Sequence, residues 1–212
     1  GAPAAARGPR ARAGPSLPFP QPMRIAIDID STLHHYWPLF ARLARERFGV
    51  TLPYEEQVTY EIDLLRPEQV AALMAESHRP EHVLAARPYD GAVETVRAWH
   101  AAGHFIHVTS HRSPDAHDAT ERWLRRIGLP FHELCCSDDK VTRCAEIEID
   151  LLIDDAPANI LRAQACGIVP ATILHPWNRE LCEEEGVIAA ETWPQLAERL
   201  APVIAAPPLR RR

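Results

Sequence analysis

Polar side chains end three short apolar runs of this sequence. Asp28 and Asp30 close the first run, Thr109 and Ser110 close the second, and Asp154 and Asp155 follow the third. Short runs rich in β-branched residues are typical of buried strands. Ligands bind beyond the carboxyl ends of the strands in an open parallel sheet, so we expect these side chains to meet at one edge.

The four aspartates of this set indicate a bound cation. Crowded carboxylates repel one another unless a positive charge compensates them. Oxygen ligands suit a hard divalent ion, and Mg²⁺ keeps coordination positions for phosphate oxygens. Lys140, the one lysine beside 22 arginines, follows another short strand and adds a point charge. Together with the Thr109 hydroxyl, these groups predict a phosphate held at Mg²⁺.

The Asp28-x-Asp30 spacing indicates that the site could carry out a reaction. Alternate residues of an extended segment point the same way, so both carboxylates can serve one reaction from one side. One can be a nucleophile and the other a general acid and base. Taken singly, each element has an ordinary structural explanation: an Asp-Asp pair caps a helix, a Thr-Ser pair forms a turn and a lysine lies at the surface. The joint order of the elements favours a site.

The segments that must position these residues alternate between helix and strand from residue 87 to residue 205. This rhythm predicts an α/β fold, a Rossmann-like parallel sheet with helices on both faces. We expect strands over 23–30, 105–109, 131–135, 149–153, 168–173 and 187–189. We expect helices over 91–102, 113–127, 140–146, 157–166 and 193–204.

Residues 33–86 lack a strand pattern and contain helical periods over 39–48 and 67–77, which predicts a helical insertion after the first strand. The body then comprises residues 23–32 and 87–205. Residues 1–22, with six prolines, are expected to form a disordered leader, and residues 206–212 a basic tail.

Charge and composition exclude several classes of protein. Six of the 23 basic residues lie in the two terminal segments, which leaves 17 basic against 29 acidic residues in the body. This acidic balance argues against binding of a nucleic-acid polymer. The longest stretch without Asp, Glu, Lys or Arg, 163–178, is too short and too rich in Pro and Gly for a membrane span. Five cysteines without a C-x-x-C motif indicate reduced thiols and a cytoplasmic protein.

These motifs resemble the four signatures of the haloacid dehalogenase superfamily of phosphotransferases. They stand here as Asp28-Ile-Asp30-Ser-Thr32, Val108-Thr-Ser110, Lys140 and Ile153-Asp-Asp155. Within the superfamily, the chain resembles the 5'(3')-deoxyribonucleotidase group over residues 27–33, 108–112, 152–159 and 176–179. Ser31 departs from the Gly, Asp or other small residue that is common at its position.

The resemblance implies a role for each motif residue. Asp28 would attack phosphorus and form an aspartyl-phosphate, and Asp30 would protonate the leaving oxygen and then activate water. Asp28, the backbone carbonyl of Asp30 and the pair Asp154 and Asp155 would hold Mg²⁺, with the direct ligand of that pair left open. Thr109, Ser110 and Lys140 would hold the phosphate, and such sites act mainly through electrostatics.

The insertion resembles the small helical cap of this superfamily, which closes over the site and selects the substrate. Tyr36 or Trp37 could stack on a base, although Trp37 and Phe40 could equally pack the insertion onto the body. Arg112 could reach a second anionic group of the substrate or lie at the surface.

The sequence therefore predicts a Mg²⁺-dependent phosphomonoesterase that acts on a small phosphate ester, a (deoxy)nucleoside monophosphate. A non-nucleotide small phosphate is the alternative substrate. Two alternatives of other classes are a receiver-like signalling domain, which also gathers Asp, Thr and Lys around Mg²⁺, and a catalytically silent phosphate-binding protein. The Asp28-x-Asp30 spacing and the insertion argue against the receiver, and the intact pair of aspartates argues against the silent protein.

Overall fold

A six-stranded, all-parallel sheet organises the chain. The computed structural model describes residues 22–206, so the expected leader and tail lie almost entirely outside the described residues. The strands are β1 (Arg24–Ile27), β2 (Phe105–Ser110), β3 (Glu133–Cys136), β4 (Leu151–Ile153), β5 (Val169–Ile173) and β6 (Ile188–Ala190). They lie in the order β3-β2-β1-β4-β5-β6, and the predicted α/β fold is confirmed.

Helices cover both faces of this sheet. Successive side chains of a strand point to opposite faces, and apolar side chains on both faces must be covered. Ile25 and Ile27 of β1 pack toward α4 (Ala92–Ala101), α5 (His117–Ile127) and α9 (Trp193–Ala205). Ala26 of β1 and Leu152 of β4 point to the other face, where α6 (Lys140–Glu146) and α7 (Pro157–Ala165) pack. The short helix α8 (Arg179–Glu185) lies between β5 and β6 in the chain, and the 3₁₀ turn η2 (Pro114–Ala116) precedes α5.

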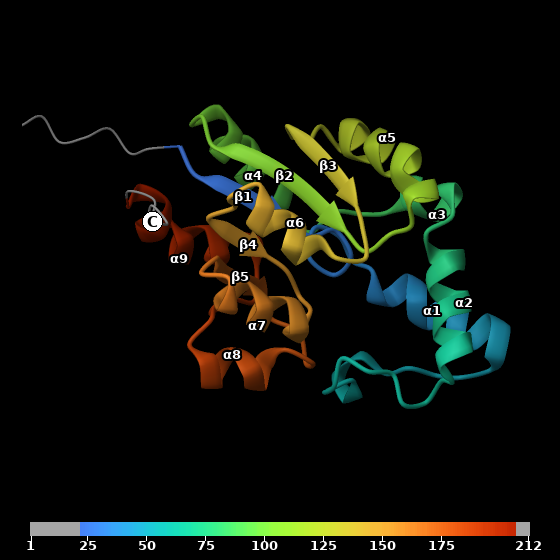
Figure 1. Cartoon of the computed structure of the whole chain (residues 1–212). Helices are drawn as coiled ribbons and strands as arrows, with labels where there is room; N and C mark the ends of the chain where they lie inside the picture. The colour runs from blue at the N-terminus through green and yellow to red at the C-terminus, as the bar shows by residue number, and fades with distance from the viewer. Residues whose placement is uncertain (1–21, 207–212) are drawn as a thin grey trace, which may run out of the picture.

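Three helices and a short turn separate β1 from the rest of the body: α1 (Trp37–Phe48), η1 (Tyr54–Glu56), α2 (Pro67–Ser77) and α3 (Pro80–Ala85). The helices α1 and α2 lie beyond the carboxyl ends of the strands (Figure 1). They share a hydrophobic cluster that is separate from the two clusters of the body and is built around Phe40, Leu43, Leu52, Leu65 and Leu73.

The helix α3 packs differently from its neighbours in the chain. Its Val83 belongs to the main core of the body, and Trp123 of α5 donates a hydrogen bond from Nε1 to the carbonyl of Ala86 at 3.0 Å. Packing therefore groups α1 and α2 together and joins α3 to the body.

Element boundaries depart from the expected ones where backbone turns intervene. β1 ends at Ile27 rather than Asp30, because the carbonyl of Ile29 accepts a hydrogen bond from the N–H of Leu33 at 2.8 Å and closes a turn. Ser31 takes a left-handed conformation in this turn, with φ of 62°. The helices expected over 67–77 and 140–146 are found with those bounds. No helix of the described residues is long and apolar enough to cross a membrane.

The buried side chains of the separate hydrophobic cluster are expected to stabilise the α1–α2 unit. Replacement Leu73→Ala, at a side chain that is fully buried, should lower the free energy of unfolding by about 2–5 kcal/mol, because it removes apolar contacts and leaves a cavity. The adjacent Met74→Ala, at a residue that is 38% exposed, is the matched control and should cost less than about 1 kcal/mol. Denaturant unfolding measures both, and equal losses would contradict this packing.

Candidate active site

Lys140 joins two of the strand ends. Asp28 follows β1, Asp154 follows β4, and Lys140 is the first residue of α6, after the loop that leaves β3. The ammonium Nζ of Lys140 lies 2.5 Å from Oδ1 of Asp28 and 2.6 Å from Oδ2 of Asp154. All three side chains are buried. The one lysine of the chain thus neutralises part of the negative charge of these buried acids.

Neighbouring groups fix the orientation of the Asp154 and Asp155 pair. Oδ1 of Asp154 accepts hydrogen bonds from the backbone N–H of Ala156 at 3.0 Å and from Nδ2 of Asn159 at 3.1 Å. Oδ2 of Asp155 accepts a bond from Nε1 of Trp177 at 3.2 Å. The two carboxylates therefore have different partners, and Asp155 is the one that lines the cavity described below.

The electrostatics of this group show a surplus of negative charge. Burial raises the pKa of Asp28 to about 7, with Lys140 opposing the rise and the carboxylates of Asp154 and Asp30 adding to it. Burial and the carboxylates of Asp28 and Asp154 also raise the pKa of Asp155 well above its ordinary value. Although burial lowers the pKa of Lys140, Asp154 and Asp28 together hold it above its ordinary value, so the lysine stays charged.

This donor set fits a hard divalent cation in its chemistry. Asp28, Asp154 and Asp155 offer carboxylate oxygens, and one lysine does not balance three buried acids. As the side chains stand, no three His, Cys, Asp or Glu residues within 22–206 are grouped closely enough to hold a metal ion. Lys140 occupies the space between Asp28 and Asp154 instead.

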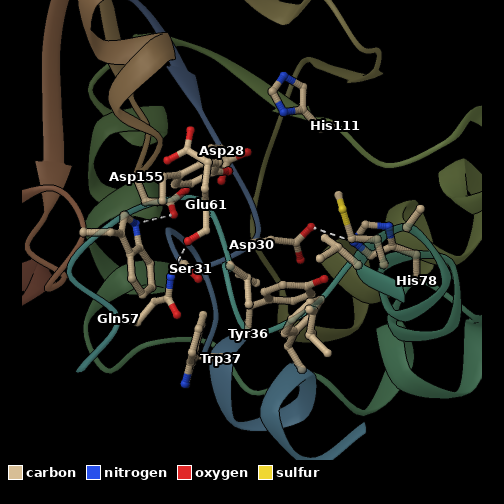
Figure 2. Close-up of a pocket in the computed structure, with 18 of the residues that line it drawn as sticks. Asp28, Asp30, Ser31, Tyr36, Trp37, Gln57, Glu61, His78, His111 and Asp155 are labelled. Carbon is tan, nitrogen blue, oxygen red and sulfur yellow. Dashed lines mark hydrogen bonds and ion pairs between the residues drawn. The ribbon is translucent and has the colours of Figure 1, made fainter. Parts of the chain in front are cut away.

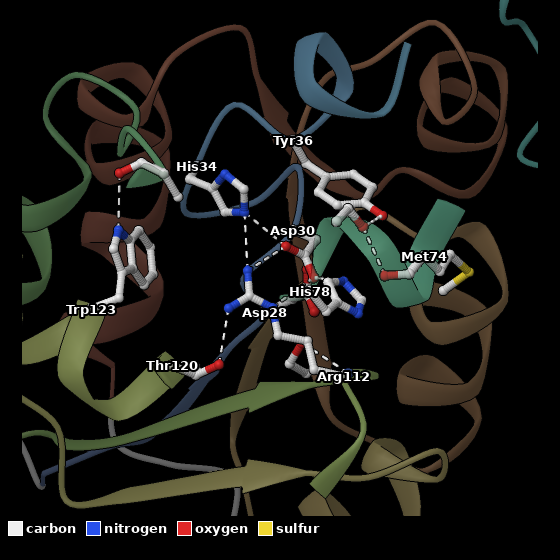
Figure 3. A network of polar contacts seen from close by, with 12 residues as sticks. Asp28, Asp30, His34, Tyr36, Met74, His78, Arg112, Thr120 and Trp123 are labelled. Carbon is white, nitrogen blue, oxygen red and sulfur yellow. Dashed lines mark hydrogen bonds and ion pairs between the residues drawn. The ribbon is translucent and has the colours of Figure 1, made fainter. Parts of the chain in front are cut away.

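Asp30 lies in a different environment from Asp28. Its Oδ1 is 2.6 Å from Nη2 of Arg112 and 2.7 Å from Nε2 of His34, and its Oδ2 is 3.1 Å from both Nε of Arg112 and Nε2 of His78 (Figure 3). Burial raises the pKa of Asp30, but the Arg112 charge and the hydrogen bonds from the two histidines outweigh it and hold this pKa well below the ordinary value. Asp30 is therefore held as a carboxylate.

The two hydroxyl residues expected to bind phosphate lie at the end of β2. Oγ1 of Thr109 is buried and has no hydrogen-bond partner among the described residues. Ser110 lines the cavity, and its Oγ accepts a hydrogen bond from the backbone N–H of Arg112 at 3.3 Å. A buried hydroxyl without a partner is an exception in folded proteins, but Thr109, unlike Ser110, is not among the residues that line the cavity described below.

A cavity of about 680 Å³ lies above these residues (Figure 2). Asp28, Asp30, Ser31, Ser110, Lys140 and Asp155 line its polar end. The segment between β1 and α3 supplies most of the apolar lining, with Tyr36, Trp37, Phe40, Ile62, Leu65 and Met74, and it also contributes the polar side chains of Gln57, Glu61 and Asp63.

The three expected substrate residues are not equivalent in the structure. Tyr36 and Trp37 line the cavity, and both rings also pack against Phe40, at centroid distances of 5.7 and 6.2 Å. Arg112 does not line it: the side chain is buried, and its fork is engaged by Asp30 and by the Thr120 hydroxyl.

Sequence reasoning missed His78 and His175. His78 follows α2 and contacts Asp30 directly, whereas His175 follows β5 and supports the turn after Asp30. Nε2 of His175 donates to the carbonyl of Ser31 at 2.7 Å, and the Tyr54 hydroxyl donates to its Nδ1 at 2.7 Å. Neither histidine belongs to a spaced motif, so no signal in the chain marks them; the adjacent Trp177 and Asn178 do lie in a stretch that carries the family resemblance.

Solved structures resemble the fold over most of its length. A haloacid dehalogenase family hydrolase from Deinococcus radiodurans, solved with bound phosphate and sodium, has a TM-score of 0.64 at 17% identity and covers 88% of this chain and 99% of its own. A haloacid dehalogenase hydrolase from Entamoeba histolytica has a TM-score of 0.60 at 13% identity and covers 84% and 99%. The fold and the acidic strand ends define a phosphatase of the haloacid dehalogenase superfamily.

The sequence places the chain within that class. The family described as "5' nucleotidase, deoxy (Pyrimidine), cytosolic type C protein" matches residues 21–205, so the chain belongs to this family. A Bacillus cereus protein described as "Putative nucleotidase" is 24% identical over 153 residues, which are 64% of this chain and 78% of that protein. The chain is thus a phosphomonoesterase, a nucleotidase-like hydrolase, and the receiver-like and non-catalytic alternatives are set aside.

His175 predicts a pH dependence of stability. Burial lowers its pKa from 6.5 to about 4, so between these values the unfolded chain binds a proton that the folded chain excludes. Stability is full above pH 6.5 and falls as the pH drops toward 4, by roughly 3 kcal/mol.

Replacement His175→Gln isolates this contribution from the carboxylates that titrate in the same range. The variant should be less stable than the parent at pH 8, and the difference should shrink as the pH falls from 6.5 to 4. Denaturant unfolding across this range measures the difference, and a constant gap would show that His175 takes up its proton equally in both states.

Proposed function

We propose that the chain hydrolyses nucleoside monophosphates through an aspartyl-phosphate on Asp28. The observation that carries this proposal is the composition of one cavity, with Asp28, Asp30 and Lys140 at one end and aromatic rings at the other. A phosphate at the polar end would place the rest of the substrate against Tyr36 and Trp37, which suits a planar base.

The charges along the cavity support a monophosphate. Lys140 is the one Lys or Arg among the described residues that line it, and the wall carries Glu61 and Asp63 as further acids. A second phosphate would meet no compensating cation there and would be repelled by these carboxylates. The family description, which names deoxy and pyrimidine nucleotidases, favours the nucleotide over another small phosphate.

Mg²⁺ is the proposed cofactor, held by the carboxylates of Asp28, Asp154 and Asp155 together with the backbone carbonyl of Asp30. Bound there, it would supply positive charge for the phosphoryl oxygens. This proposal rests on the surplus of buried acid described above and on the preference of this ion for oxygen ligands.

The residues of the chain divide the reaction between them. An oxygen of Asp28 attacks phosphorus, and the bond between phosphorus and the ester oxygen breaks. Asp30 is a carboxylate in the free protein. Binding of a phosphate dianion beside it raises its proton affinity, so that Asp30 takes up a proton from water and gives this proton to the departing oxygen. Asp30 then takes a proton from the water that attacks the aspartyl-phosphate, which releases inorganic phosphate and restores Asp28. Lys140, Thr109 and Ser110 hold the phosphoryl oxygens.

The residues between β1 and α3 are proposed to act as the substrate-selecting cap, since they supply the apolar end of the cavity. Their own hydrophobic cluster would let α1 and α2 act as a unit. A cytoplasmic setting agrees with the five cysteines, all of which are free thiols in the described structure.

Replacement Asp28→Asn tests the nucleophile. Because an amide cannot form the acyl phosphate, turnover of a nucleoside monophosphate with Mg²⁺ should fall by about a thousandfold or more, while the circular dichroism spectrum stays that of the parent. The control is Asp118→Asn, at a side chain that is 97% exposed, and it should keep the parent's rate. Acid-quenched parent should also carry labelled phosphate that the Asp28 variant lacks; a variant that hydrolyses as fast as the parent would refute the assignment.

Replacement Trp37→Leu tests the base-binding wall. Loss of a stacking surface worth about 1 kcal/mol should raise KM for a nucleoside monophosphate roughly fivefold. Glycerol phosphate, which has no ring to stack, serves as the internal control, and its KM should stay unchanged. Steady-state kinetics measure both, and a rise of equal size for the two substrates would show that Trp37 packs the protein without contacting the base.

A further inference from the structure

Three different side chains contact the Asp30 carboxylate, although a single partner could orient it. Its two carboxylate oxygens meet four donor atoms, from the residue pair His34 and Arg112 of the body side and from His78 after α2. We propose that Arg112 and His78 are positioning residues for Asp30. Because His78 follows α2, proton transfer to the leaving group then depends on how α2 is placed relative to the body. This proposal rests on the function proposed above and deepens it.

Arg112 holds Asp30 with a geometry that a lysine cannot reproduce. Nη2 and Nε of one guanidinium contact the two oxygens of the carboxylate, at 2.6 and 3.1 Å. The third nitrogen, Nη1, donates to the Thr120 hydroxyl of α5 at 3.0 Å. All three guanidinium nitrogens of Arg112 therefore have a partner. Because the residue is 2% exposed, the body of the protein fixes the plane of the Asp30 carboxylate.

His78 contacts the same carboxylate from a different part of the chain. It follows the last residue of α2, whose Ser77 hydroxyl donates to the carbonyl of Met74 at 2.9 Å and lies 2.8 Å from the Tyr36 hydroxyl. These bonds fix the end of α2, and Nε2 of His78 then reaches Oδ2 of Asp30 at 3.1 Å. Since α2 packs in the α1–α2 cluster and Asp30 lies in the turn after β1, this contact spans two separately packed parts of the chain.

The orientation of Asp30 matters most when the leaving oxygen needs a proton. A phenolate or alkoxide of high basicity leaves slowly unless it is protonated, whereas p-nitrophenolate leaves without help. Loss of positioning should therefore reduce hydrolysis of a poor leaving group selectively. A role in folding alone would reduce hydrolysis of good and poor leaving groups by the same factor.

The test compares phenyl phosphate with p-nitrophenyl phosphate in the presence of Mg²⁺, since both bring a similar ring to the cavity. The measured quantity is kcat/KM, which reports the steps up to release of the first product. Arg112→Lys and His78→Asn should each lower kcat/KM for phenyl phosphate at least about tenfold more than for p-nitrophenyl phosphate. The control His82→Asn, at a histidine of α3 whose imidazole lies 3.9 Å from a Glu76 oxygen, should leave both values unchanged.

Each outcome decides between the roles. Equal losses on the two substrates, or no loss, would overturn the positioning role of the residue replaced. Arg112→Lys alters a buried ion pair and could prevent folding; His78, with a side chain that is 11% exposed at the end of a helix, then still tests the proposal. Failure of the parent itself to hydrolyse either ester would overturn the proposed function, and this result is distinct from a selective or equal loss in a variant.

Discussion

Negative charge concentrated on buried side chains is the constraint on which this structure depends. The parallel sheet brings Asp28, Asp154 and Asp155 to one edge, where all three are buried, and the single ammonium of Lys140 reaches two of them at 2.5 and 2.6 Å. Burial of unbalanced acids opposes folding. The folded chain by itself therefore leaves a surplus of negative charge, and the proposed cation would neutralise this surplus.

Asp28 and Asp30, with a single residue between them, have surroundings that shift their pKa values in opposite directions. Asp28 faces burial and neighbouring acids, and these hold its pKa at about 7 although Lys140 opposes them. Asp30 is surrounded by an arginine fork and two histidines, and its pKa lies well below the ordinary value. The separation of environments comes from the turn at Ile29–Leu33, which directs Asp30 away from the strand line and toward Arg112 and the end of α2. The difference in environment that the proposed roles of the two carboxylates require thus originates in local backbone geometry.

The sequence predicts those parts of the molecule that depend on neighbouring residues in the chain. Strand ends marked by Asp28, Ser110 and Asp154 are readable because apolar runs stop there, and the parallel sheet follows from their rhythm. Contacts across the fold are not readable in this way. The sequence alone leaves Arg112 as a substrate-binding or surface residue, because only tertiary packing brings its side chain to Asp30 and Thr120. His78 and α3 were missed for the same reason, since the position of α3 is set by the contact of Val83 with the body.

The left-handed residue in the turn after Asp30 also limits how this chain can vary. Ser31 has a φ of 62°, is buried, and lends its carbonyl to His175. A side chain in this conformation costs about 1 kcal/mol or more, and branching at the β-carbon makes it worse. Valine, isoleucine and threonine are therefore barred from this position, while glycine and asparagine are admissible substitutes. Among homologous sequences, the residue at the position of Ser31 should therefore vary according to which side chains tolerate a left-handed backbone, and not according to the chemistry of the phosphoryl group.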